Sequence, residues 1–303
     1  MTRLPPDDAH ELPAAAVARA FGRASGSYDA AARLQALVRD ELLQRLAVLR
    51  LTPQVVLDLG AGTGLAAAQL KRMYPRSLVL AADLAPAMVA AIRRRSSPWR
   101  RLRGLVADAR QLPLPDASVD VVFSSLMLQW CDPPDAALAE ARRVLRPGGL
   151  LLLSSFGPDT LRELRSAWAT VDDGVHVNRF VDLHDLGAAL QRCGYAEPVL
   201  DVDRHVLAYP DALTLMRELK AIGAHNVNAG RSRALTGRHR YQAMVTAYEA
   251  LRRPAGLPAT YEVVYATAWA PDRDGGHAAA LPIRPESGIS LGAMMANLRK
   301  KRR

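Results

Sequence analysis

A glycine-rich turn at the end of an apolar segment constrains this 303-residue chain more than any other feature. The segment runs from Val55 to Gly64 as VVLDLGAGTG, and a helical pattern starts at Leu65. Glycine permits positive φ angles and lets a ligand approach the main chain closely, while the helix N-terminus behind the turn offers free N–H groups. In open α/β sheets, ligands bind beyond the carboxyl ends of the strands. The turn therefore predicts a parallel-sheet domain that holds a nucleotide-type ligand.

The spacing within this turn distinguishes between possible ligands. A dinucleotide fingerprint needs a glycine where Leu65 stands, and a phosphate loop needs a Gly-Lys-Ser/Thr sequence that does not follow here. An acid, Asp58, lies inside the strand just before the turn, where it repels a pyrophosphate and suits a cation. S-adenosylmethionine (SAM) carries an ammonium and a sulfonium group and no phosphate. The alternative interpretation of the motif alone is a tight strand-to-helix turn that binds nothing.

Strand-like and helical segments alternate over the first half of the chain. A helical pattern over residues 14–49 comes first, and helices are expected over 65–73, 86–95 and 134–145. This alternation with short connections predicts an α/β fold with a doubly wound, mostly parallel sheet. Seven strands are expected, at Val55–Leu59, Ser77–Ala82, Leu102–Ala107, Val119–Ser124, Leu150–Ser155, Val199–Leu207 and Tyr261–Trp269.

The remaining segments suggest a single domain with additions. Residues 13–271 are expected to form the domain, with helical lid elements near 156–181 and 211–251 over the carboxyl edge of the sheet. Residues 1–12 are expected to be disordered. Residues 272–303 are expected to form a flexible basic tail, in which 289–298 has the pattern of a short amphipathic helix.

Composition excludes several classes of protein. No apolar run approaches the roughly 20 residues of a membrane span, and the first residues lack the apolar core of a secretory signal. The two cysteines, Cys131 and Cys193, fit no metal spacing or disulfide framework and favour a cytoplasmic setting. The net charge of +10 would suit nucleic acid, but no aromatic residues alternate with the basic runs. We therefore expect solvated basic helix faces, no membrane, metal or nucleic-acid partner, and a surface that attracts acidic proteins.

Polar residues at the strand ends are candidates for binding the ligand. Asp83 lies about twenty residues beyond the glycines, where an acid accepts ribose hydroxyls, although it would also cap the helix that starts near Pro86. Asp108 is suited to accept an adenine amine while the Ala109 N–H serves a ring nitrogen, and the alternative is a surface turn acid. Ser124 should lie beside the glycine turn if the strand order reverses between the first and fourth strands.

As a set, these sites resemble the class I SAM-dependent methyltransferase pattern over about residues 20–160. The Arg143–Gly149 turn before the fifth strand belongs to the same pattern. The resemblance implies that SAM is the methyl donor and is held by Asp58 near the methionyl ammonium, by the backbone of Gly60, Gly62 and Gly64, by Asp83 at the ribose, and by Leu84, Asp108 and Ala109 around the adenine.

A second, narrower resemblance is to the BioC family of malonyl-acyl-carrier-protein O-methyltransferases, which acts in biotin synthesis. Its matches reach from the N-terminal helix to Trp269 and fall largely in the expected lid. The matching segments are Ala20–Asp29, Gln129–Cys131, Thr160–Trp168, His176–Phe180, Leu215–Ala224 and Leu257–Val263.

The BioC resemblance implies a simple reaction. The free carboxylate of a malonyl thioester, carried by acyl carrier protein or by coenzyme A, attacks the SAM methyl group and becomes a methyl ester that primes pimeloyl synthesis. A carboxyl group with a pKa near ~4 is already ionised at neutral pH, so no catalytic acid or base is expected. Catalysis should come mainly from positioning the two reactants.

The expected acceptor residues lie in the lid and the N-terminal helix. Arginine binds carboxylates in a bidentate manner, and our candidate is Arg179, with a surface salt bridge as its alternative role. Tyr28 would close the pocket or simply pack between helices, and His176 would form a polar wall or be structural. Lys220 and Arg217 would receive an acidic carrier protein or be solvated.

Three other functions remain open from the sequence. A related SAM-fold protein that hydroxylates a protein arginine during complex I assembly has a stretch like Phe156–Leu164, although the arginine within His176–Phe180 favours a carboxylate acceptor. A methyltransferase for quinones or other small molecules is the second. A SAM-fold protein that binds a partner or RNA and has lost catalysis is the third, against which the intact acids Asp58, Asp83 and Asp108 argue.

Overall fold

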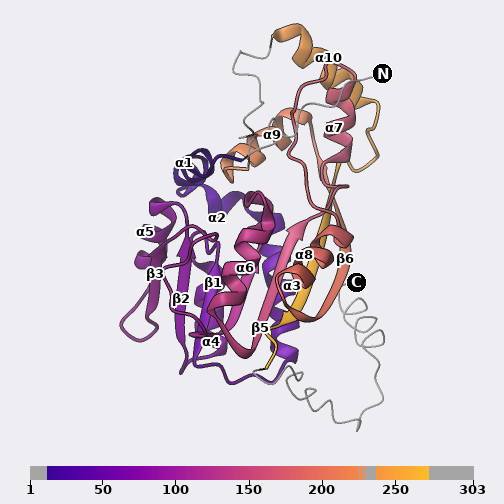
Figure 1. Ribbon diagram of the computed structural model, residues 1–303. Coiled ribbons are helices and arrows are strands. Elements are labelled where there is room, and N and C mark those ends of the chain that lie inside the picture. Colours follow the sequence, from indigo (N-terminus) through magenta and orange to yellow (C-terminus); the bar gives the residue numbers. More distant parts are fainter. Residues whose placement is uncertain (1–11, 225, 227, 229–236, 273–303) are drawn as a thin grey trace.

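The computed structural model describes residues 12–224, 226, 228 and 237–272, which form a sheet with helices on both faces and beyond one edge (Figure 1). The sheet has seven strands in the order β3-β2-β1-β4-β5-β7-β6, and only β7 runs antiparallel to its neighbours. The predicted α/β fold with a mostly parallel seven-stranded sheet is confirmed. The strands are β1 (Val55–Leu59), β2 (Leu78–Asp83), β3 (Leu102–Val106), β4 (Val119–Ser125), β5 (Leu145–Phe156), β6 (Ala196–Tyr209) and β7 (Leu257–Trp269).

Two hydrophobic layers follow from the alternation of side chains along the buried strands. Val56 of β1 belongs to one layer and its neighbours Leu57 and Leu59 belong to the other, because successive strand residues face opposite sides of a sheet. Helices α3 (Arg33–Val48), α4 (Leu65–Met73) and α5 (Pro86–Arg95) cover the first face, and α6 (Pro134–Val144) and α8 (Leu183–Arg192) cover the second.

A group of helices, to which we give the name lid, lies beyond the carboxyl edge of the sheet (Figure 1). Its helices are α1 (Ala14–Ala24), α2 (Tyr28–Ala31), α7 (Arg162–Ala169), α9 (Ala212–Ala221) and α10 (Arg238–Glu249). Connectivity explains this placement: α7 follows β5 and α9 follows β6, while α10 precedes the antiparallel β7. The segment 156–181 is less helical than its pattern suggested, because α7 ends at Ala169 and residues 170–181 contain no helix.

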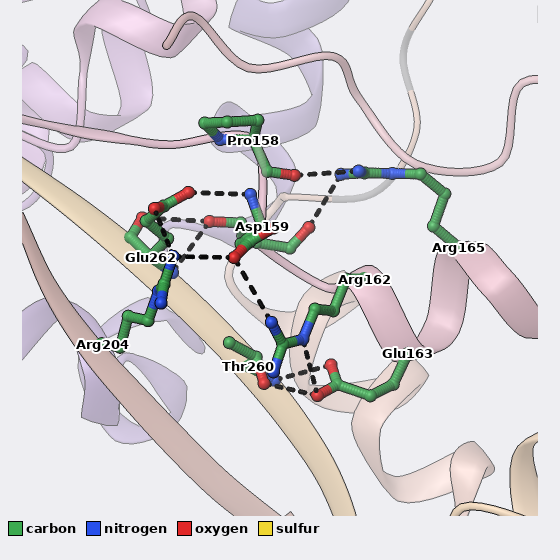
Figure 2. Close-up of polar contacts among 9 residues, drawn as sticks. Pro158, Asp159, Arg162, Glu163, Arg165, Arg204, Thr260 and Glu262 are labelled. Carbon is green, nitrogen blue, oxygen red and sulfur yellow. Dashed lines mark hydrogen bonds and ion pairs between the residues drawn. The ribbon is translucent and has the colours of Figure 1, made fainter. Parts of the chain in front are cut away.

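A polar cluster fastens the base of α7 to β7 (Figure 2). Glu262 of β7 accepts a hydrogen bond from the Asp159 amide at 2.8 Å and an ion pair from Arg204 at 3.3 Å. Glu163 of α7 is almost fully buried and accepts the amide of Thr260 at 3.0 Å and the hydroxyl of the same residue. These contacts fix the direction in which the lid leaves the sheet.

The chain ends bear on three further expectations. The expected disorder of residues 1–11, the tail over 273–303 and the helix over 289–298 lie outside the described residues. Leu12, which the sequence placed in the disordered segment, is described and is buried in a small cluster with Val17 and Ala20. In the described part of the chain, every helix is too short or too polar to cross a membrane.

Candidate active site

A crevice opens beyond the carboxyl ends of β1, β2 and β4, where the strand order reverses. We call it the sheet crevice. One wall is the glycine turn, another is formed by the ends of β2 and β3, and α1 forms the cover. Its lining includes Val17, Phe21, Tyr28, Gly60, Gly62, Asp83, Leu84, Asp108, Ala109, Ser125, Met127 and Trp130.

The glycine turn lets the backbone form the floor of this crevice. Gly60 and Gly62 have φ angles of +76° and +54°. A Cβ atom at Gly60 would lie 2.1 Å from Cγ of Met127, so no larger residue fits there. Gly64, expected to bind the ligand as well, instead faces α5, where a Cβ atom would lie 2.9 Å from Ile92. A glycine is therefore needed at position 64 for packing against α5, and Gly64 is not among the residues that line the crevice. Its predicted backbone contact with the ligand stays a prediction.

Asp83 connects the glycine turn to the end of β2. Its Oδ2 accepts a hydrogen bond from the Gly62 amide and its Oδ1 accepts one from the Ala85 amide, both at 2.8 Å. Burial raises the pKa of this carboxyl, and the two amide hydrogen bonds oppose the rise. The side chain organises the turn before α5 but does not cap this helix, whose N-cap residue is Ala85. Asp83 lines the crevice, and its role as an acceptor for ribose hydroxyls stays a prediction.

Asp58 lines a smaller pocket on the other side of the turn, which we call the Asp58 pocket. The pocket also contacts Tyr28, Asp29, Gln35 and Arg39. Asp58 is 1% exposed, and its Oδ2 is buried without a hydrogen-bond partner among the described residues. Burial raises the pKa of this carboxyl to about 7. An orphaned buried carboxylate oxygen next to a glycine turn fits the ammonium of a methionyl group, so the residues present are compatible with SAM.

Of the remaining residues predicted to bind the donor, three line the sheet crevice and one does not. Leu84 and Ala109 line the sheet crevice as apolar contacts. Asp108 also lines it, but both its carboxylate oxygens accept hydrogen bonds from Arg110, and these bonds, ahead of the opposing effect of burial, lower its pKa. Ser124 points elsewhere: its hydroxyl is buried and donates to the Leu59 carbonyl at 2.9 Å. The next residue, Ser125, lines both cavities instead.

Tyr28 lies at the boundary between the sheet crevice and the Asp58 pocket and lines both. Burial, followed by the charges of Asp83 and Asp29, raises the pKa of its hydroxyl well above the ordinary range. The hydroxyl is therefore a neutral hydrogen-bonding group and not a base at physiological pH.

The cover over the sheet crevice was missed from the sequence. Ala14, Val17, Ala18 and Phe21 of α1 line it, and Phe21 packs edge-to-face on Trp130 with 5.0 Å between ring centroids. The steps of three, four and seven residues in this set are the periodicity of one helix face. That stripe was the signal available in the sequence.

A larger cavity, the lid cavity, adjoins both of these spaces. It shares Gln35 with the Asp58 pocket and Trp130 with the sheet crevice. Its walls come from the segment between β5 and α8, from α9 with the residues after it, and from the start of α10. The lining includes Phe156, Thr160, Leu164, Trp168, Asp172, His176, Asn178, Met216, Leu219, Lys220, Asn226, Arg240 and Tyr261.

His176 is held rigidly in the wall of the lid cavity. Its ring stacks on Trp168 with 3.8 Å between centroids and 6° between planes. Its Nε2 lies 2.7 Å from Oδ1 of Asp172, whose other oxygen pairs with Arg240. The Gly174 amide also donates to Asp172 at 2.8 Å. The result is an oriented polar wall in which one carboxylate holds two cavity-lining donors.

Arg179 is not brought to the lid cavity. It is exposed and lines a separate outer groove together with Arg165, Asp182 and Arg192. The neighbouring Asn178 is buried, lines both spaces and accepts a hydrogen bond from Asn228 at 2.8 Å. Arg179, His176 and Tyr28, which the sequence grouped, therefore line different spaces, although the outer groove adjoins the lid cavity at Asn178 and Phe180.

Comparisons with known proteins agree with this architecture. The methyltransferase domain family matches residues 57–153. A solved methyltransferase-type protein from Bacillus halodurans superposes with a TM-score of 0.56 at 17% identity, covering 77% of this chain and 98% of that one. The fold and the donor site define a class I SAM-dependent methyltransferase, with SAM as the methyl donor.

Full-length relatives narrow the class to a family. A malonyl-acyl-carrier-protein O-methyltransferase of Laribacter hongkongensis is 51% identical over 263 residues, covering 84% of this chain and 89% of that protein. One from Methylovorus is 48% identical over 270 residues, covering 87% and 91%. The chain belongs to the malonyl-acyl-carrier-protein O-methyltransferase family, as the sequence resemblance predicted.

Proposed function

We propose that this enzyme transfers the SAM methyl group to the free carboxylate of a malonyl thioester, giving the methyl ester that primes pimeloyl synthesis for biotin. The acceptor carrier is acyl carrier protein, with coenzyme A as the alternative source of the same thioester. Membership in the family, whose curated relatives carry this activity in their names, supports the choice of acceptor.

One structural observation carries the proposal: the lid cavity meets the donor spaces at Gln35 and Trp130. A thioester arm that enters between α7 and α9 reaches this junction with its terminal carboxylate. The wall of the lid cavity is apolar at Leu164 and Trp168 and polar at His176. A cavity with both kinds of wall suits an acyl chain that ends in a carboxylate.

The residues of the donor side have separate tasks in this proposal. Bound SAM supplies a methyl group on a positively charged sulfur. Asp58 would bind the methionyl ammonium, and the Gly60 and Gly62 backbone would hold the methionyl chain. Asp83 would accept the ribose hydroxyls, and Leu84, Asp108 and Ala109 would hold the adenine.

No proton has to be moved in this reaction. The carboxylate is ionised before it binds, one C–O bond forms as the methyl–sulfur bond breaks, and the charge of the sulfonium and that of the carboxylate disappear together. The protein contributes by holding the two groups in line and excluding water.

We also propose a reducing, cytoplasmic setting for the enzyme, with which the free thiols of Cys131 and Cys193 agree.

The test is incubation of the purified full chain with isotopically labelled SAM and malonyl-acyl carrier protein or malonyl-coenzyme A. Mass analysis should find the label in a methyl ester on the malonyl group, with faster turnover of one carrier identifying the acceptor. Acetyl-acyl carrier protein, which lacks the free carboxylate, is the matched control and should stay unlabelled. Unlabelled malonyl thioester alongside SAM binding would contradict the proposal.

A further inference from the structure

The C-terminal end of α9 lies beside the place where the lid cavity meets the donor spaces. The Ser27 hydroxyl donates a 2.8 Å hydrogen bond to the Ala221 carbonyl, which ties α9 to the residue before Tyr28. Gly223, with φ +76°, packs so closely on α1 that a Cβ atom would lie 3.1 Å from the Ala20 carbonyl. A side chain at the end of α9 therefore lies near the transfer junction.

Lys220, near the C-terminal end of α9, is a cation that lines the lid cavity. Met216, Leu219 and Lys220 all line the lid cavity, as expected for positions three and four residues apart on one helix face. Lys220 is exposed, so its long side chain is free to follow an incoming anion. Arg217, one residue after Met216, is also exposed but does not line the cavity.

The charges around Lys220 leave its ammonium available. Among the residues the structure describes, no carboxylate lies within ion-pair distance of it. The acid of the same helix, Glu218, accepts the Tyr209 hydroxyl at 2.7 Å. The other cation of the cavity wall, Arg240, is held by Asp172, and Arg179 belongs to the outer groove.

We propose that Lys220 binds the carboxylate of the acceptor and makes the enzyme selective for the free acid over its ester. This inference rests on the proposed function and names the residue that recognises the reacting group. An ammonium attracts the anion at the junction and provides hydrogen bonds that strengthen with charge. Methyl transfer removes the negative charge of the acceptor, so the same contact weakens and the product ester leaves.

The first test compares Lys220→Ala with Arg72→Ala, which removes an exposed cation of α4 that lines neither the lid cavity nor the outer groove. Loss of one charge-assisted contact should raise KM for malonyl-acyl carrier protein about 10- to 100-fold in Lys220→Ala, and Arg72→Ala should stay within about twofold. The SAM dissociation constant should not change in either variant. Lys220→Arg should recover most of the activity, because it restores the charge.

A second measurement is independent of turnover. With S-adenosylhomocysteine bound, wild type should bind the malonyl thioester about tenfold more tightly than its methyl ester, and Lys220→Ala should bind the two equally. Unchanged selectivity in Lys220→Ala, or an equal loss of SAM affinity, would overturn the role of Lys220. If wild type forms no methyl ester at all, the proposed function itself fails, and that outcome is distinct from both.

Discussion

The sheet crevice and the lid cavity, which we propose to bind the methyl donor and the acceptor, are built in different ways. The crevice is built from consecutive strand ends, so its glycines and acids lie in short motifs after β1, β2 and β3. The lid cavity is assembled from segments as distant as Gln35 and Tyr261. Donor recognition is therefore a local property of the sheet, whereas acceptor recognition depends on how the lid packs onto it.

The two regions also differ in how much change they tolerate. The crevice uses backbone in the positive-φ region, where a side chain at position 60 collides with Met127. The lid cavity uses side chains in hydrogen-bonded pairs, such as His176 with Asp172. We infer that substitutions on the donor side cause large losses of SAM affinity, whereas substitutions on the acceptor side cause smaller, graded changes in KM for the malonyl thioester.

The largest effect is expected from Gly60→Val. The new side chain collides with Met127 and takes a φ of +76°, which costs an ordinary residue about 1–2 kcal/mol even without a clash. Calorimetry should find the SAM affinity reduced more than about 100-fold, which corresponds to a loss of at least about 2.8 kcal/mol of binding free energy. Gly22→Ala, at a site where a Cβ atom meets nothing within 4 Å, is the control and should bind SAM normally.

Asp58→Asn should reduce SAM affinity by about 10- to 30-fold, because a charged hydrogen-bond partner of the ammonium is lost. Since burial raises the pKa of Asp58 to about 7, wild-type affinity should increase as the pH rises from 6 to 8 and the carboxyl loses its proton. The variant should show a flat profile over this range. Titrations of both proteins at several pH values make the comparison, and identical profiles would remove Asp58 from the ammonium site.

The same shift has a consequence for stability without SAM. The pKa of Asp58 is higher in the folded protein than the value near 3.9 of an unfolded chain, so the folded state binds the extra proton between about pH 4 and 7. Stability of the wild type should therefore decline as the pH rises through this window. Asp58→Asn should be more stable than wild type above pH 7, by up to about 4 kcal/mol, in denaturant unfolding experiments.

The donor side could be predicted from the sequence because its information is local. An apolar strand, an acid and three alternating glycines were enough to predict that Asp58, Gly60 and Gly62 lie together, and the structure places all three along one pocket. For two residues predicted on this side, the structure differs from the prediction in the side of the strand or turn that the residue faces. Ser124 was one residue out, since successive strand side chains face opposite sides, and Gly64 faces α5 because the helix has already begun.

The acceptor side could not be predicted in the same way. Arg179 lies three residues after His176 in a motif that looks continuous, yet residues 170–181 contain no helix that would fix which side each residue faces. One residue points into the lid cavity and the other lines the outer groove. The packing of the segment between α7 and α8 determines which space each residue lines. Packing between segments that are distant in the chain leaves no periodic pattern in the sequence.

Asp172→Asn should have a moderate effect confined to the acceptor. The asparagine keeps the shape but weakens the hold on His176 and Arg240, so KM for the malonyl thioester should rise about fivefold, roughly the worth of one hydrogen bond. Burial alone would raise the pKa of Asp172, but hydrogen bonds from His176, Gly174 and Arg240 outweigh it and lower the pKa.

The lowered pKa gives this variant a second signature. The ionised Asp172 stabilises the fold above its unfolded pKa near 3.9, and this contribution disappears as the pH falls through the lower folded value. The stability deficit of Asp172→Asn should thus be present at pH 7 and vanish in acid. Asp173→Asn, at the exposed neighbouring position, is the control, and an equal rise in KM there would show that the wall is not specifically organised by Asp172.

The smallest effect is expected from Arg179→Ala, and it tests the boundary between the two sides of the lid. Because Arg179 is exposed on the outer groove, kcat/KM for the malonyl thioester and SAM affinity should both stay within about twofold of wild type, a change below 0.5 kcal/mol. Asn178→Ala, one residue earlier but buried at the lid cavity, should lose more. If Arg179→Ala instead loses tenfold or more of acceptor turnover at unchanged SAM affinity, the carboxylate enters from the outer groove, and the acceptor site must be moved there.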